Sequence, residues 1–308
     1  MKILIELPSW LGDTLMATPA IENIISHFDD AKITFIGSKV SIETLKLHPK
    51  VNLTKIINKN YFEFYRTAKT LGYFDVFLSF RNSFRSNIHK LFIKSQIKYQ
   101  FDKKKYINRH QVEKYNDFIN DSLNLNAPAG PLFLYPKRLH SNNKKILGIN
   151  PGASYGSAKR WYPEEFAKVA LALSSDYDIH LFGGPNEKDI AGEIEQLFNS
   201  LGLKNFKNYA GKTSVNQLIE LISQVDLFIT GDSGPMHVAA SFNIPTVAIF
   251  GPTNDIETSQ WKNEKNINIK KNLSCQPCMS RTCPLGHHNC MRLIKSTDVL
   301  EAINLIEV

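Results

Sequence analysis

The amino-acid sequence predicts an α/β protein with two doubly wound domains. Short apolar runs, typical of buried strands, alternate along most of the chain with longer runs of helical periodicity. The alternation pauses over residues 126–145, which are rich in Pro, Asn and Lys, and then starts again. A length of 308 residues allows each domain a core of its own. We therefore expect Rossmann-like domains over residues 1–135 and 146–308, facing each other across a cleft.

Composition places the chain among globular proteins, with 43% hydrophobic and 21% charged residues. The formal net charge of +8 would suit an anionic substrate or an anionic membrane surface. It would also suit nucleic acid, but the sequence has no recognisable nucleic-acid motif, so we expect no such partner. Glu6 and Pro8 interrupt the apolar start, which therefore lacks a secretory h-region. Prolines and glycines interrupt the longest uncharged stretch, Ser233–Asn254, so we expect a cytoplasmic protein without a membrane span.

The first domain is expected to alternate strands and helices in order. Strands are predicted at residues 2–7, 33–37, 53–57 and 76–80, and helices near 42–47, 62–71 and 112–123. A further helical run after the first strand contains Pro19. Either Thr18 caps that helix and Pro19 is its first residue, or its first turn is distorted.

The loop Pro8–Asp13 after the first strand carries an acid that we expect to be exposed at the mouth of the sheet. A carboxylate near a helix start is favoured in its charged form, so Asp13 should be able to accept a proton. It is either a helix cap or a general base. Further along, the basic segment that contains Arg81 and Arg85 could bind an anionic group or form a solvated helix face.

The second domain repeats the same alternation. Strands are predicted at 146–150, 179–182, 227–230 and 246–250, and helices from 163, over 187–201 and 214–223, and from 235. In the last unit, Pro235 suits the first helical position, and the N–H groups near Ser233, Gly234 and Met236 would favour a phosphate. Asp232 and His237 flank this turn and could hold a ribose or a sugar. A turn of this kind also occurs in doubly wound folds without any ligand.

Three loops at predicted strand ends would carry the chemistry: Ser9–Asp13, Ser154–Arg160 and Gly231–His237. Lys159 and Arg160 suit a diphosphate that gains charge as it leaves. Asp13 could remove a proton from an attacking hydroxyl group. This division of labour describes glycosyl transfer. A dinucleotide-dependent dehydrogenase is disfavoured, because the turn PSWLGD lacks the glycine pattern that admits a pyrophosphate.

The cysteines are all within 16 residues, at Cys275, Cys278, Cys283 and Cys290, with His287 and His288 nearby. This spacing resembles a zinc ribbon. In a reducing cytosol, free thiols in a structured loop are the alternative, and we expect them rather than a metal.

Four blocks of sequence together resemble the heptosyltransferases of glycosyltransferase family 9. They are LPSWLGDTLMATPAI, NPGASYGSAKRWYPEEFAKVA, GDSGPMHVAAS followed by IPTVAIFGPT, and CQPCMSRTCPLGHHNCM. The resemblance runs from residue 1 to about residue 300 and implies a GT-B fold. It also implies an inverting transfer from ADP-L-glycero-β-D-manno-heptose (ADP-heptose) to a lipid A–Kdo core, with no required cofactor.

The resemblance also implies roles for residues at matching positions. Asp13 resembles the catalytic base, and Ser9 and Gly12 belong to its loop. The donor-binding positions would be Ser154, Lys159, Asp232, Ser233, Gly234, Met236 and His237, whereas Arg81 and Arg85 are weaker candidates for the acceptor. The N-terminal domain would then bind the acceptor and the C-terminal domain the donor, and the last helix could pack back on the N-terminal domain.

Within the family, the sequence is most similar to enzymes that add the second heptose of the inner core. Transfer of the first or third heptose, or a GT-B-like nucleotide-sugar epimerase, are the alternatives. An acceptor anchored in the inner membrane implies peripheral contact with its inner face, with which the basic first half is compatible.

Overall fold

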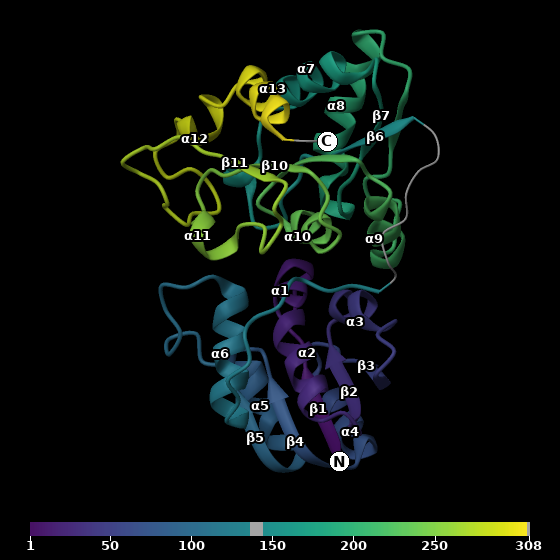
Figure 1. The fold of residues 1–308 in the computed structure, drawn as a ribbon, viewed down its shortest axis with the longest axis vertical. Coiled ribbons are helices and arrows are strands. Elements are labelled where there is room, and N and C mark those ends of the chain that lie inside the picture. The colour runs from purple at the N-terminus through teal and green to yellow at the C-terminus, as the bar shows by residue number, and fades with distance from the viewer. Residues whose placement is uncertain (136–143, 307–308) are drawn as a thin grey trace. The chain divides into compact units, whose positions relative to one another are not determined.

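Two parallel sheets organise the chain, one in each of two units that span Met1–Pro136 and Lys137–Val308 (Figure 1). The computed structural model describes residues 1–135 and 144–306. The connection predicted over residues 126–145 therefore falls partly on residues 136–143, outside the described residues.

The first sheet has five parallel strands in the order β3-β2-β1-β4-β5. They are β1 (Lys2–Glu6), β2 (Lys32–Gly37), β3 (Val51–Ile56), β4 (Tyr73–Ser79) and β5 (Lys94–Gln100). The central strands are buried on both faces, as their continuous apolar runs predict. The order reverses between β1 and β4, which makes their carboxyl ends the switch point where ligands bind in such sheets. Strand β5 was not predicted, because lysines make this edge strand look like solvated surface.

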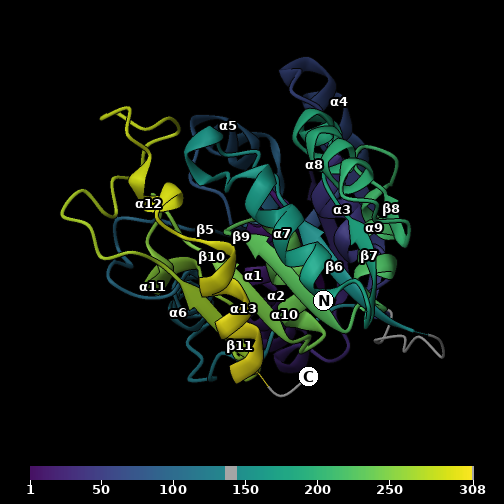
Figure 2. The same ribbon diagram turned by 90° about the horizontal axis from the view of Figure 1, so that it is seen from above.

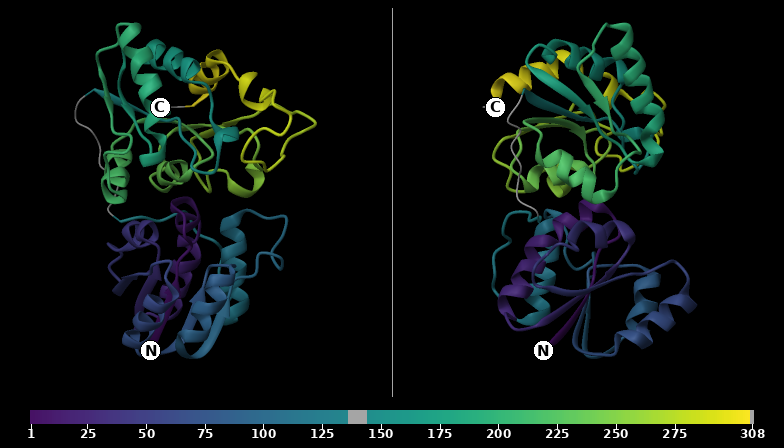
Figure 3. Two further views of the ribbon diagram at one scale, coloured as in Figure 1. Left: turned by 180° about the vertical axis from the view of Figure 1, so that it is seen from behind. Right: turned by 90° about the vertical axis from the view of Figure 1, so that its right-hand side faces the viewer.

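The helices of the first unit cover both faces of its sheet. They are α1 (Leu11–Met16), α2 (Thr18–His27), α3 (Lys39–Leu45), α4 (Tyr61–Leu71), α5 (Phe84–Phe92) and α6 (Gln111–Leu123). In the right-hand view of Figure 3, α4 and α5 lie on one side of the sheet, and α2 and α6 lie on the other. Phe64 and Ala68 of α4 pack with Leu4 and Phe77 in a buried apolar cluster.

The second sheet has six parallel strands in the order β11-β10-β9-β6-β7-β8. They are β6 (Lys145–Asn150), β7 (Tyr177–Leu181), β8 (Phe206–Asn208), β9 (Leu227–Gly231), β10 (Thr246–Ile249) and β11 (Asn266–Ile269). The switch point lies between β6 and β9. The fold class predicted from the sequence, α/β with two doubly wound sheets, is confirmed. Only the short strands β8 and β11 were not predicted in this unit.

The helices of the second unit also cover both faces. They are η1 (Ser157–Lys159), α7 (Pro163–Leu173), η2 (Pro185–Glu187), α8 (Lys188–Ser200), α9 (Val215–Ser223), α10 (Gly234–Ser241), α11 (Asp255–Thr258), α12 (Asn289–Arg292) and α13 (Ser296–Leu305). Figure 2 shows α7, α8 and α13 over one face, above the main core. Helix α13, the last of the described helices, packs on α7, β10 and β11 of this same unit. None of the helices in the described ranges is long and apolar enough to span a bilayer.

Two helix starts differ from the sequence prediction. The end of the predicted loop Pro8–Asp13 forms the start of helix α1 (Leu11–Met16). Ala17 then caps α2, with Thr18 as its first residue and Pro19 as its second, so Thr18 is not the cap. Pro19 is tolerated there because the first N–H groups of a helix have no intrahelical acceptor. In α10, Ser233 is the N-cap and Pro235 is the second residue, one position later than predicted.

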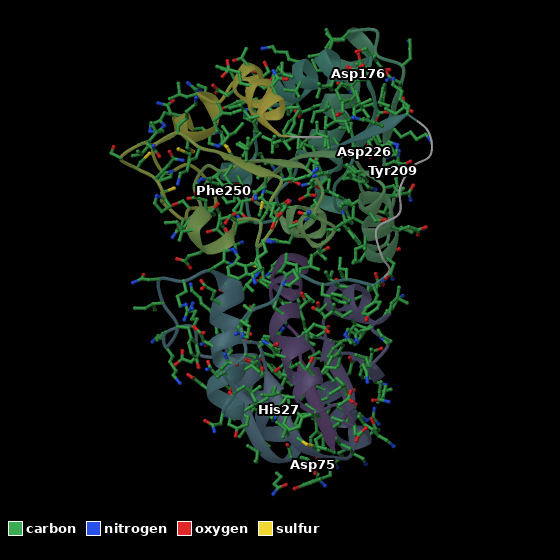
Figure 4. The ribbon with its side chains drawn as sticks, viewed as in Figure 1. His27, Asp75, Asp176, Tyr209, Asp226 and Phe250 are labelled. Atoms are coloured by element: carbon green, nitrogen blue, oxygen red, sulfur yellow. The ribbon has the colours of Figure 1, made fainter. Side chains whose placement is uncertain are left out.

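Two half-buried carboxylates hold the amino ends of the sheets rather than their carboxyl ends (Figure 4). Asp75 of β4 accepts a hydrogen bond from the backbone N–H of Lys2 at 2.6 Å. Asp226, just before β9, accepts from the N–H of Ile146 at 2.8 Å. In both units, an acid on the second switch-point strand thus holds the start of the first. These acids are structural, and the candidate chemistry lies at the opposite edge.

Candidate functional site

An ion pair joins the two loops at the switch point of the second sheet. Nζ of Lys159, in the loop after β6, lies 2.6 Å from Oδ2 of Asp232, which follows β9. Both side chains are largely buried, at 11% and 6% exposure. Oδ2 of Asp232 also accepts a hydrogen bond from Thr253. Two residues predicted from separate motifs are therefore direct partners, and the negative charge of Asp232 holds the ammonium group in place.

Polar side chains surround this pair at the ends of β6 and β9. Nδ2 of Asn150 approaches Oγ of Ser233 at 3.2 Å, and Oγ of Ser233 lies 3.1 Å from Oγ1 of Thr230. Oδ1 of Asn150 is buried without a hydrogen-bond partner among the described residues. A buried acceptor of this kind costs free energy unless a ligand or water satisfies it. The switch point is therefore a polar site and not simply the end of a core.

The turn before α10 is only partly available for a phosphate. The Ser233 side chain makes no capping hydrogen bond to the helix. The N–H of Met236, predicted to point outward, instead donates to the carbonyl of Ser233 at 3.2 Å. The Met236 side chain packs with Ala248 and Phe250 in the core. It therefore does not reach the site where the donor substrate is predicted to bind. Gly234 begins the helix and His237 is buried in its first turn.

Ser154 has a partner that the sequence analysis missed. Its hydroxyl donates to Oε1 of Glu187 at 3.3 Å, and Oε2 of Glu187 accepts from the N–H of Gly184 at 2.6 Å. A β-carbon on Gly152 would collide with this carboxyl group, so the loop after β6 passes directly against it. Glu187 is 6% exposed at the carboxyl end of β7, next to the switch point. The only signal in the sequence is the run Gly183-Gly184-Pro185-Asn186-Glu187 after a predicted strand, a pattern that by itself predicts a helix start.

The cysteine-containing segment braces the loop that carries Lys159. Nε2 of His288 lies 2.9 Å from the Ala158 carbonyl, and the Ala158 N–H donates to the Arg281 carbonyl at 3.0 Å. The Tyr155 hydroxyl donates to the Met279 carbonyl at 2.6 Å. A β-carbon on Gly156 would collide with the Arg281 carbonyl, which explains why glycine stands there. These contacts fix the backbone that leads into Lys159.

The thiols themselves line one small pocket together with both neighbouring histidines. All four cysteines are free, and only Cys290 is buried. Burial raises the pKa of Cys290, and the charges of the other thiols raise it further. Hydrogen bonds from backbone N–H groups, first that of His288, lower the pKa of Cys283. Within the described ranges, no group of three or more His, Cys, Asp or Glu residues is arranged to hold a metal ion.

In the first unit, Asp13 lies on a short helix at the switch point rather than in a loop. It is the third residue of α1 and is half-buried, between Gly12 and the buried Thr14. The preceding turn is fixed, because the Ser9 and Pro8 carbonyls accept hydrogen bonds from Ser38 and Ser41 of α3.

A buried tyrosine lies close enough to Asp13 to feel its charge. Burial raises the pKa of Tyr115 well above its ordinary value, and the negative charge of Asp13 raises it further. The phenol therefore keeps its proton at neutral pH.

Arg81 is engaged with a buried acid instead of standing free for an anion. Its Nη1 lies 3.1 Å from Oε1 of Glu6, the last residue of β1, which is completely buried. Nδ1 of His89 approaches the same oxygen at 2.6 Å, and the Ser79 hydroxyl donates to Oε2 at 2.7 Å. Burying a carboxylate without partners costs several kcal/mol, and the ion pair with Arg81 offsets part of this cost for Glu6.

Arg85 lies in α5 and contacts an aromatic side chain of α4. Its guanidinium group lies over the ring of Tyr61, 5.7 Å from the centroid. Its Nε is buried without a hydrogen-bond partner in the described part of the chain. Asp13 follows β1, and both arginines follow β4, where Arg81 is held by Glu6.

The sequence profile of glycosyltransferase family 9 (heptosyltransferase) matches residues 65–289. The chain belongs to this family. A curated family 9 relative, lipooligosaccharide heptosyltransferase 2 of Campylobacter jejuni serotype O:2, is 46% identical and covers 100% of this chain and 99% of its own length. Lipopolysaccharide heptosyltransferase 2 of Escherichia coli K12 is 26% identical over 99% and 98% of the two chains. The resemblance stated from the sequence is therefore confirmed.

The fold agrees with a solved family 9 structure. ADP-heptose LPS heptosyltransferase II of Escherichia coli matches with a TM-score of 0.81 and 25% identity, over 99% of this chain and 98% of that chain. The GT-B arrangement of two parallel-sheet domains that the resemblance implied is confirmed. As a family 9 glycosyltransferase, the protein places its polar residues at two switch points, which is where its fold predicts ligands.

Proposed function

We propose that the protein transfers L-glycero-D-manno-heptose from ADP-heptose to the heptosyl-Kdo-lipid A inner core, adding the second heptose. We infer the acceptor from the names of the relatives, which call them heptosyltransferase 2. The observation that carries the donor side is the ion pair of Lys159 and Asp232 at the start of α10. A fixed ammonium group beside a helix N-terminus suits a diphosphate.

The second unit would bind the donor through residues already in contact. Lys159 would bind the diphosphate. The Glu187 carboxylate would accept hydrogen bonds from ribose hydroxyls, and the Ser154 hydroxyl would donate to them or accept from them. Asp232, Ser233, Gly234 and His237 would shape the turn below the nucleotide sugar. The first unit would bind the acceptor, with Ser9 and Gly12 in the loop next to the base.

Asp13 would act as the general base. The acceptor hydroxyl oxygen attacks the anomeric carbon of the heptose, and its proton passes to the Asp13 carboxylate. The bond between that carbon and the phosphate oxygen breaks, and ADP leaves with the electron pair. Lys159 and the N–H groups at the start of α10 stabilise the charge that develops on the diphosphate. Attack from the side opposite the leaving group inverts the anomeric configuration.

Arg81 and Arg85 would both contact the acceptor, but through different N–H groups. Arg81 has N–H groups besides the one that meets Glu6, and Arg85 has an Nε without a partner among the described residues. Because the acceptor is a lipid, we also propose that the enzyme works in the cytoplasm at the inner face of the membrane, as a peripheral protein.

The test is a transfer assay with ADP-heptose and lipid A cores that carry zero, one or two heptoses. We expect a gain of one heptose in mass only on the core that carries one. Gain on the core without heptose would assign the enzyme to the first transfer, and gain on the core with two would assign it to the third. Turnover of ADP-heptose to an isomer without any acceptor would instead support the epimerase alternative.

A further inference from the structure

Helices α4 and α5 expose large apolar side chains that the catalytic proposal does not use. Phe62 of α4 is 65% exposed, and Phe84 and Leu91 of α5 are each 77% exposed. Single exposed apolar residues are common on protein surfaces, whereas clusters on adjacent elements mark interaction sites. We call these residues, together with Arg66 and Lys69 of α4, the α4–α5 surface.

The helical geometry explains why these side chains face outward. Helix α4 turns Phe64 and Ala68 into the core, so residues half a turn away, including Phe62 and Arg66, must face solvent. In α5, the buried residues are Ser86 and His89, which leaves Phe84 and Leu91 on the opposite side.

The two helices form one continuous surface. The Phe92 ring of α5 meets the Tyr65 ring of α4 edge-on, with centroids 5.2 Å apart. The guanidinium group of Arg85 lies over Tyr61, 5.7 Å from its centroid. Figure 3 shows the helices beside each other on one side of the first sheet. Neither helix turns its outer face toward the sheet.

Positive charge accompanies the aromatic rings. Arg66 lies over the Phe62 ring at 5.3 Å, and Lys69 lies over the Tyr65 ring at 4.5 Å. Residues 53–100 contain nine Lys or Arg and two Asp or Glu, a formal charge of +7 out of +8 for the whole chain. One of the two acids, Glu63, accepts a hydrogen bond from Asn58. The segment that contains α4 and α5 therefore carries most of the formal net charge of the chain.

We propose that the α4–α5 surface docks on a lipid bilayer that contains anionic lipids. Exposed aromatic and leucine side chains gain free energy by entering the boundary between headgroups and acyl chains. Arginine and lysine beside them complement the negative headgroups. This assigns a place to the peripheral contact, and it rests on the proposed function only in that a lipid acceptor gives the contact a purpose.

The experiment is sedimentation of the full-length protein with vesicles. One set contains equal parts of phosphatidylcholine and phosphatidylglycerol, and the other contains phosphatidylcholine alone. The wild type should sediment with the anionic set, and high salt should release it. The variant Phe84→Ser/Leu91→Ser should bind the anionic vesicles about tenfold more weakly than the wild type. We expect the same loss for Arg66→Gln/Lys69→Gln.

Matched variants control for general effects. Ile256→Ser/Leu305→Ser removes apolar side chains of similar exposure, 68% and 79%, from the second unit. Lys103→Gln/Lys104→Gln removes the same charge from an exposed turn of the first unit. Both should bind vesicles like the wild type. Failure of the wild type to bind anionic vesicles, or an equal loss in the control variants, would overturn the proposal.

A second assay separates this inference from the proposed function. Transfer to a core from which the acyl chains have been removed needs no bilayer, so the surface variants should keep wild-type rates there. Vesicle binding without any transfer would overturn the heptosyltransfer proposal but leave the docking surface standing. Transfer by a wild type that binds no vesicles would overturn the docking surface but leave the heptosyltransfer proposal standing.

Discussion

The two sheets are wound in the same way, but the buried acid at each switch point belongs to a strand in the first unit and to a loop in the second. At the switch point of the first sheet, the β1 strand itself ends in a charge: Glu6 is fully buried and is satisfied by Arg81, His89 and Ser79. At that of the second, β6 ends in the neutral Asn150, and the charged pair of Lys159 and Asp232 belongs to the loops.

This difference separates a cation that serves the fold from one that can serve a ligand. A charge paired inside the sheet cannot change partners without leaving a buried ion behind. A pair in the loops can share its ammonium group with an incoming phosphate. A basic residue after a strand end is therefore best judged by whether its acid belongs to the strand or to a loop. The following substitutions test this difference between the two units.

The largest effect is expected at Asp13, which is an acid of the first unit outside the Glu6 network. Asp13→Asn should lower the transfer rate by about 10² to 10⁴-fold, because the amide cannot accept the proton. ADP binding, measured by calorimetry, should stay at the wild-type level. Asp30→Asn, an exposed acid of the same unit, is the matched control. A parallel loss of ADP binding would count against the assignment as base.

The next effect concerns the stability of the first unit. Arg81→Ala should lower the free energy of unfolding by about 3 kcal/mol, because the fully buried Glu6 loses its permanent cation. Urea unfolding measures this difference. Lys105→Ala breaks an exposed pair with Asp121 and should leave the stability almost unchanged, because solvent screens such pairs. Unchanged stability with weakened acceptor binding would show instead that Arg81 serves the acceptor.

In the second unit, Lys159→Met should weaken ADP binding by about ten- to a hundredfold, through loss of a charge-assisted contact. The same substitution leaves Asp232 buried with Thr253 as its remaining side-chain donor, so stability should fall too. The double variant Lys159→Met/Asp232→Asn removes the unpaired charge and should regain stability without regaining affinity. Recovery of both would mean that the pair is purely structural.

The smallest effect tests the brace around Lys159. His288→Ala removes the contact to the Ala158 carbonyl and should weaken ADP binding by about three- to tenfold, since one hydrogen bond contributes about 1 kcal/mol. His27→Ala, an exposed histidine of the first unit, should change nothing. Calorimetric titration with ADP measures both variants, and equal affinities would contradict the bracing role.

Local patterns in the sequence were sufficient for most elements of the fold. Alternating apolar runs predicted the central strands, and the prolines at 163 and 235 marked helix starts to within one position. The misses share a physical cause. Helix α1 is six residues long, too short to show a period, and β5 is an edge strand whose lysines face solvent.

For the candidate site, residue types were predicted better than their partners. Lys159 and Asp232 were both named, but their direct pairing was not. Neither the contact of Glu187 with Ser154 nor that of Arg81 with Glu6 follows from the sequence. The cysteine segment was considered for its thiols, whereas its histidine and backbone groups hold the Lys159 loop.

The sequence by itself determined the α/β class and membership of the family, because motifs and periodicity are local. Only the tertiary structure decided which charges meet. Asp232 lies 73 positions from Lys159, His89 lies 83 from Glu6, and His288 lies 130 from Ala158. Such contacts depend on which strands become neighbours in the sheet, and the order reverses at each switch point. No local pattern records that order, so burial and pairing had to come from the fold.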